Sequence, residues 1–248
     1  MSQLAFSALV ALGFALVHVL GPAMTFLRKT PRSIWLSSAG GISVAYVFIH
    51  VLPELARYQE NFREQFGRTG PVGSLENHSY LIALFGLATF YGLDRLARGS
   101  ARQQAKLHGE KHPSAAVFWL HLSAYALYSV LIGYLLLHRE EPDPRGMIIY
   151  AVAMGMHFIV NDQAMRDQHG AMYDRIGRWL LALAPMIGWA LGSIVELPRL
   201  AIPSLFAFLM GGVVLNVLKE ELPEDRESRF WAFAAGAAAY SALLIVTR

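Results

Sequence analysis

Long apolar segments recur along the whole chain, and they constrain its fold more than any other feature of the sequence. Each is bounded by charged residues or by Pro and Gly, and is close to the roughly 20 helical residues that cross a hydrocarbon core of about 30 Å. Helices satisfy their own backbone hydrogen bonds in that environment. Only 16% of the residues are charged, against about a quarter in soluble domains. We therefore predict an all-α fold, a polytopic membrane helical bundle.

The apolar segments predict eight transmembrane helices in a single membrane domain over residues 1–248. The sixth and seventh helices are joined by a turn at 196–199, where Pro198 ends one helix and starts the next. The fifth is the least apolar. The predicted spans lie near residues 4–27, 34–56, 79–98, 115–138, 147–166, 178–196, 200–218 and 229–247. No cleavable signal peptide is expected, because the first segment lacks a basic leader and is long enough to span.

Basic residues orient the predicted bundle, because Lys and Arg favour the cytoplasmic side of a membrane. With the N-terminus outside, fourteen Lys and Arg residues, Arg166 among them, fall in inner segments and seven in outer ones. This bias predicts an integral protein of the plasma (inner) membrane with both termini outside. The longest inner segment, 99–114, is predicted as a polar loop. The net charge of +3 is too small to indicate nucleic-acid binding.

Small residues in the last two spans predict close helix packing. They are Gly211 and Gly212 in the seventh span and the run 234–239 in the eighth. We interpret them as packing positions without a chemical role.

Five groups of polar side chains fall within the predicted spans. Each is costly in hydrocarbon, so each should face the bundle interior and find a partner. The groups are His18; His50 with Glu54; His121 with Ser123; His157 with Asn161 and Asp162; and Asn216 with Lys219 and Glu220.

The fourth and fifth spans carry the residues best suited to bind a metal ion. Imidazole and carboxylate groups are usual zinc ligands, and the absence of cysteine excludes thiolate ligands. Because the two spans are adjacent and antiparallel, we expect His121 and His157 to meet near mid-bilayer. With Asp162 or Asn161 they would hold one metal ion. The alternative is that these side chains hydrogen-bond one another and hold the helices together.

His50 and Glu54 are four residues apart at the outer end of the second span, hence on one helical face. One interpretation is a site where a metal ion enters the protein. The simpler one is that Pro53 ends the helix and leaves Glu54 in water.

Two segments resemble the ZIP family of metal transporters. The second span ends His50-Val51-Leu52-Pro53-Glu54, where that family's second helix commonly ends His-Leu-Leu-Pro-Glu. The seventh span with its end, 211–224, is similar to the family's seventh helix, and eight spans with both termini outside also match. The resemblance implies transport of a divalent metal ion, Zn²⁺ or a similar ion, as substrate, and no enzymatic activity.

The fourth and fifth spans depart from the ZIP pattern. The family's fourth helix typically reads His-Asn-x-Pro-Glu, and this chain has His121-Leu-Ser-Ala-Tyr125. The fifth typically reads His-Glu-x-Pro-Glu, and this chain has His157-Phe-Ile-Val-Asn161. Both histidines remain, while the carboxylates that bridge a pair of metal ions are replaced. We therefore expect at most one metal ion, bound by the two histidines with Asn161 or Asp162.

Three functions remain open on these grounds. The first is a divalent-metal transporter with this single site, and the second is a ZIP-like scaffold or partner protein that no longer transports. The third, ranked last, is an intramembrane metal hydrolase in which His121, His157 and Asp162 hold a zinc ion that activates water. The expected partners are the lipid bilayer, a divalent metal ion and a second copy of the chain in a homodimer.

Overall fold

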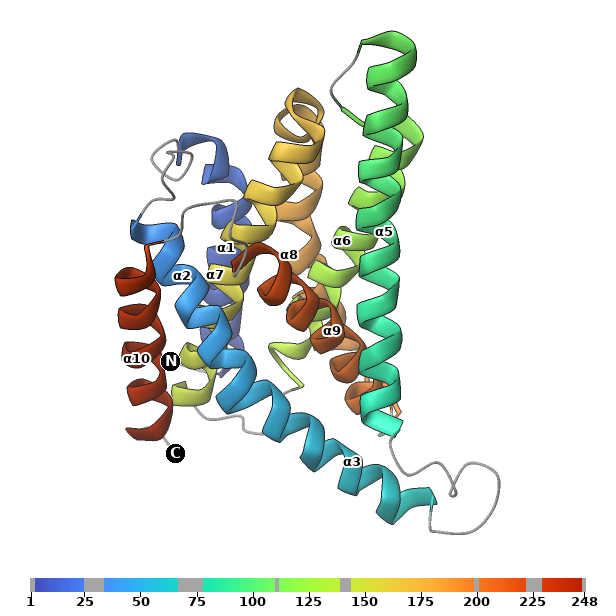
Figure 1. Ribbon diagram of the computed structural model, residues 1–248. Helices are drawn as coiled ribbons and strands as arrows, with labels where there is room; N and C mark the ends of the chain where they lie inside the picture. The colour runs from blue at the N-terminus through green and yellow to red at the C-terminus, as the bar shows by residue number, and fades with distance from the viewer. Residues whose placement is uncertain are drawn as a thin grey trace.

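Helices run through nearly all of the described chain, so the predicted all-α class is confirmed (Figure 1). This computed structural model describes residues 3–24, 34–66, 78–109, 112–138, 144–198, 201–221 and 229–246, and no strand occurs among them. The α-helices are α1 (Gln3–Leu20), α2 (Ile34–Tyr46), α3 (Leu52–Phe66), α5 (His78–His108), α6 (Ala115–Leu135), α7 (Pro144–His169), α8 (Arg178–Ile194), α9 (Ala201–Asn216) and α10 (Phe230–Val246). A short 3-10 helix, η1 (Gly21–Ala23), follows α1, and three π-helical turns are η3 (Val47–Val51), η4 (Tyr173–Gly177) and η5 (Val217–Glu221).

Among the described residues, six helical segments are long and apolar enough to cross a membrane, so the helices are those of an integral membrane protein. They span Gln3–Leu20, Ser37–Glu60, His78–Leu107, Ala115–Leu135, Tyr173–Ile194 and Ala201–Lys219. The predicted span 147–166, within α7, is outside this set because polar residues crowd its second half. The shorter α10 is apolar but has 17 residues. The count of eight spans therefore stays a prediction.

Three helix pairs cross in backbone contact, and glycines make each crossing possible. The pairs are α2 with α10, α5 with α9 and α6 with α8. In chain order each pair encloses the next, and α7 lies at the centre of the sequence of pairs. A Cβ built on any of six glycines would lie 1.9 to 2.3 Å from a backbone oxygen of the partner helix; they pair as Gly41 with Gly236, Gly86 with Gly211, and Gly133 with Gly188. The predicted packing role is confirmed for Gly211 and, within the 234–239 run, for Gly236, whereas Ala235, Ala238 and Ala239 are exposed.

Pro53 does not end the second predicted span, so this expectation is wrong. The π-helical η3 leads directly into α3, and the helix continues to Phe66. A proline ring clashes with the carbonyl four residues back, which here belongs to Ile49. Ile49 lies inside η3, whose wider turn shifts the hydrogen-bond pattern away from that clash. Glu54 is therefore buried, with 5% of its surface exposed, and is not left in water.

The predicted loop 99–114 is helical over most of its length. The helix α5 has 31 residues and continues to His108, which gives it a length of roughly 46 Å, more than the hydrocarbon core of about 30 Å. Its polar C-terminal part therefore extends beyond the apolar layer.

The absence of native cysteine allows the predicted topology to be tested with single-cysteine variants. Gln103 is exposed near the end of α5, on the predicted inner side, and Glu196 is exposed after α8, on the predicted outer side. In sealed right-side-out vesicles, a membrane-impermeant maleimide should label Glu196→Cys and leave Gln103→Cys unlabelled until the vesicles are opened. Labelling of Gln103→Cys in sealed vesicles would contradict the orientation.

The glycine crossings can be tested on α5 with two identical substitutions. Gly86→Ala places a methyl group 2.0 Å from the backbone oxygen of Phe208, so the helices must separate. We expect a loss of about 1–3 kcal/mol in the free energy of unfolding, as for other overpacked positions. Gly92→Ala on the same helix meets open space and should be tolerated. Thermal unfolding in detergent measures both, and equal stability of the two variants would contradict the packing argument.

Candidate functional site

The polar side chains of α7 divide between different faces of the helix. Successive residues are rotated by about 100°, so Asn161 lies about 40° around the helix from His157, whereas Asp162 lies about 140° away. All three side chains are buried. The first two face α6 and α9, and Asp162 faces α1. The four predicted ligands therefore do not gather around one point.

His157 and Asn161 belong to a hydrogen-bonded cluster that joins three helices. The amide nitrogen of Asn161 donates to Nε2 of His157 over 3.0 Å, so Nε2 is the unprotonated ring nitrogen. The Tyr128 hydroxyl of α6 donates to the same nitrogen over 2.8 Å. The side chain of Asn216 on α9 donates to Oδ1 of Asn161. The Nε2 lone pair already accepts hydrogen bonds. This agrees with the alternative that these side chains bond one another and hold the helices together.

Asp162 pairs with a histidine from the first helix. Nδ1 of His18 donates to Oδ1 of Asp162 over 2.8 Å, and the two residues are only 1% and 2% exposed. The other carboxylate oxygen, Oδ2, and the other ring nitrogen, Nε2, have no partner in hydrogen-bonding geometry among the described residues, although the Tyr173 hydroxyl lies close enough to Asp162 to interact with it. The pair therefore offers one carboxylate oxygen and one imidazole nitrogen, two donor types that zinc accepts.

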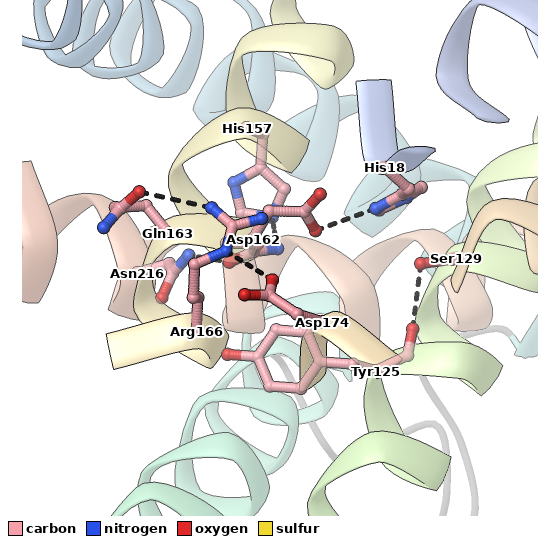
Figure 2. A network of polar contacts seen from close by, with 10 residues as sticks. His18, Tyr125, Ser129, His157, Asp162, Gln163, Arg166, Asp174 and Asn216 are labelled. Carbon is pink, nitrogen blue, oxygen red and sulfur yellow. Dashed lines mark hydrogen bonds and ion pairs between the residues drawn. The ribbon is translucent and has the colours of Figure 1, made fainter. Parts of the chain in front are cut away.

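Arg166 is buried beside Asp162, although the sequence places it among the topology-setting charges of an inner loop. Only 6% of its surface is exposed, because Tyr173 of η4, with its ring centroid 5.5 Å from the guanidinium, and Gly21 after α1 lie against it. Its Nε donates to Oδ1 of Asp174 on η4 over 2.8 Å, and Nη1 donates to Gln163 over 3.5 Å. Its Nη2 has no partner among the described residues. In Figure 2 the guanidinium lies between the carboxylates of Asp162 and Asp174.

A small pocket lies between the end of α1 and α7. It is small, because the centre of a water-sized sphere finds room in only about 10 Å³ of it. Its lining combines apolar side chains with the three polar residues of the Arg166 neighbourhood: Val17, Gly21, Met24, Ile159, Asp162, Gln163 and Arg166. Asp162 and Arg166 therefore both line the same pocket.

His121 pairs with His169 and not with His157. Nδ1 of His121 lies 3.0 Å from Nε2 of His169, and both rings are buried. His169 follows His157 by twelve residues, a rise of roughly 18 Å along α7, so the structure does not bring His121 and His157 together. Burial, together with the nearby His112, lowers the pKa of His169 to about 4, so its ring is neutral near pH 7.

His50 and Glu54 lie on the continuous η3–α3 segment. The imidazole of His50 stacks on Tyr46 with ring centroids 5.1 Å apart, and Glu54 forms an ion pair with Arg57. A role of this pair in metal access stays a prediction.

Sequence reasoning missed Arg166, His169 and Asp174 as site residues, and it left His18 without a partner. Helical spacing contained part of the missing signal, because Asp162, Arg166 and His169 are at positions i, i+4 and i+7 and so share one face. Within the described ranges, no three His, Asp or Glu side chains form a group that could hold a metal ion. No protein-family model matches the chain, and no curated protein matches its sequence.

The Tyr128 hydrogen bond tests whether the His157 cluster holds helices together. Tyr128→Phe removes only the hydroxyl that bonds His157, so we expect a loss of about 0.5–1.5 kcal/mol in the free energy of unfolding. The same change at Tyr91, which is exposed on α5, should have little effect. Unfolding in detergent measures both, and an unchanged stability for Tyr128→Phe would show that the bond is not structural.

Proposed function

We propose that the protein transports a divalent metal ion of the zinc class across the membrane, and that Asp162 and His18 bind the ion on its way. The observation that carries this proposal is the His18–Asp162 pair. A carboxylate buried among apolar helices is costly and is characteristic of an ion pathway. Here it keeps one oxygen without a hydrogen-bond partner, while the imidazole of His18 holds its other oxygen and carries an unprotonated Nε2 on the far edge of the ring.

The ligand atoms favour a zinc-like ion, and they favour one ion over a pair. Imidazole nitrogen together with carboxylate oxygen suits zinc and similar transition metals, whereas Mg²⁺ and Ca²⁺ prefer oxygen ligands alone. Asp162 is the only buried carboxylate that α7 contributes among the described residues. One carboxylate does not offset the repulsion between two close divalent ions. The resemblance of the second and seventh spans to ZIP transporters points to the same substrate class.

The polar residues of α7 supply a succession of groups along a possible route. Asp162, Arg166 and His169 share one face and extend over roughly 10 Å, about a third of a hydrocarbon core of about 30 Å. The His121–His169 pair lies at the end of this row and offers two further imidazoles. In the predicted orientation this end faces the inside of the cell.

A membrane scaffold without transport is the second candidate. The observation that favours it is the cluster of Tyr128, His157, Asn161 and Asn216, whose hydrogen bonds link α6, α7 and α9. Such polar contacts hold helices together in membranes. We place the metal hydrolase last, because it needs His121, His157 and Asp162 around one ion, and these three side chains have different partners.

Zinc uptake into proteoliposomes tests the transport proposal. Asp162→Asn keeps the shape of the side chain but removes its charge, so we expect uptake to fall about tenfold or more, at least as much as for loss of a group that supports a metal ligand. Asp167→Asn makes the same change at an exposed position of α7 and should leave uptake unchanged.

Two results would contradict the proposal. The first is equal uptake by the native protein and Asp162→Asn. The second is a purified protein that neither contains zinc by elemental analysis nor moves it in liposomes, which would favour the scaffold.

A further inference from the structure

Arg166 and Asp162 face the same pocket without touching. Nη2 of Arg166 and Oδ2 of Asp162 both lack a partner among the described residues. A Cβ built on Gly21 would lie 2.9 Å from that nitrogen and 3.3 Å from that oxygen, so both atoms border the space that Gly21 leaves open. A buried cation and a buried anion thus lie on either side of a small empty space.

The other side of the guanidinium is held by Asp174. That bond, over 2.8 Å, reaches a side chain that is 39% exposed, so Asp174 retains solvation that Asp162 lacks. A buried charge without a partner costs several kcal/mol, and an opposite charge nearby offsets that cost. A modest rotation of the Arg166 side chain would exchange the partly solvated carboxylate for the buried one.

We propose that Arg166 is a tethered cation that competes with the transported metal ion for Asp162. This inference rests on the proposed function, because it assigns the ion to Asp162 and His18. With a metal ion at Asp162, the guanidinium stays on Asp174. When the ion leaves, the guanidinium moves into the pocket beside Gly21 and pairs with Asp162, so a cation again lies beside the carboxylate in addition to its hydrogen bond from His18.

The competition has a consequence for selectivity. A divalent ion gains about twice the Coulomb energy that a monovalent ion gains at the same distance from the carboxylate. An ion with a single charge must displace a guanidinium of equal charge, so it gains little by the exchange. The tethered arginine therefore makes the site selective for divalent ions over Na⁺ and K⁺.

A purely structural role for Arg166 predicts different behaviour. If the side chain serves only to anchor η4 through Asp174, its removal lowers stability and leaves the affinity of Asp162 for metal unchanged or weaker. Competition predicts the opposite change in affinity: the metal ion binds more tightly after the cation is removed. The two roles are therefore separated by binding affinity and not by stability.

The experiment is Zn²⁺ binding to the full chain in detergent, followed by calorimetric titration. Arg166→Gln removes the competing charge, and we expect Zn²⁺ to bind about tenfold more tightly, since a unit charge a few ångströms away is worth at least that factor. Arg166→Lys keeps the charge and should bind Zn²⁺ like the native protein. Arg175→Gln makes the same change at an exposed position of η4 and is the control.

A steric variant tests the same inference without changing any charge. Gly21→Ala places a methyl group in the space that the guanidinium must enter, so Zn²⁺ should again bind more tightly than in the native protein. The close neighbour is the flexible end of Arg166, so the fold should tolerate the change. Gly13→Ala on α1 meets open space and should have native affinity.

Each outcome decides one of the two proposals. If Asp162→Asn abolishes Zn²⁺ binding but Arg166→Gln and Gly21→Ala bind no more tightly than the native protein, the competition is wrong and the metal site stands. A tighter Arg166→Gln site that persists in the Arg166→Gln/Asp162→Asn double variant also overturns the competition, because the effect does not pass through Asp162. If Asp162→Asn leaves Zn²⁺ binding unchanged, both proposals fall.

Discussion

The burial of polar side chains on α7 is the constraint on which the rest of the structure depends. Hydrocarbon offers these groups no hydrogen bonds, so every partner must come from the protein. Neighbouring helices must therefore lie close to α7 on several sides, and they supply His18, Tyr128 and Asn216. Large apolar side chains such as Trp35 and Phe85 are exposed on the outside of the molecule, as expected of surfaces that face lipid.

The glycine crossings make this enclosure possible. Helices with larger residues at the crossing points would stand farther apart, and their polar side chains would not reach across the gap. With six glycines at three crossings, the pairs α2–α10, α5–α9 and α6–α8 approach to backbone contact. The small residues that carry no chemistry thus set the distance between the paired helices that surround α7 in chain order.

The sequence predicts the helical elements well and the polar contacts poorly, for physical reasons. Length and apolarity are local properties, so the helix positions follow from them. The prediction that Pro53 ends the helix was wrong, because a π-helical turn accommodates a proline that would end a regular helix. Arg166 was assigned to an inner loop, but helices extend past their apolar part. A charged residue at the end of a predicted span can therefore still be buried. The pairing of His18 with Asp162 joins residues 144 positions apart, and no local pattern encodes it.

The position of the one buried carboxylate on α7 decides which helices it can contact. Asn161, four residues after His157, is an amide, and the carboxylate is the next residue, Asp162. A shift of one residue rotates a side chain by about 100° around the helix. The carboxylate therefore turns away from Tyr128 and Asn216 and toward His18 of α1. The same rotation places it on the face of Arg166, so the buried carboxylate has a fixed positive charge beside it.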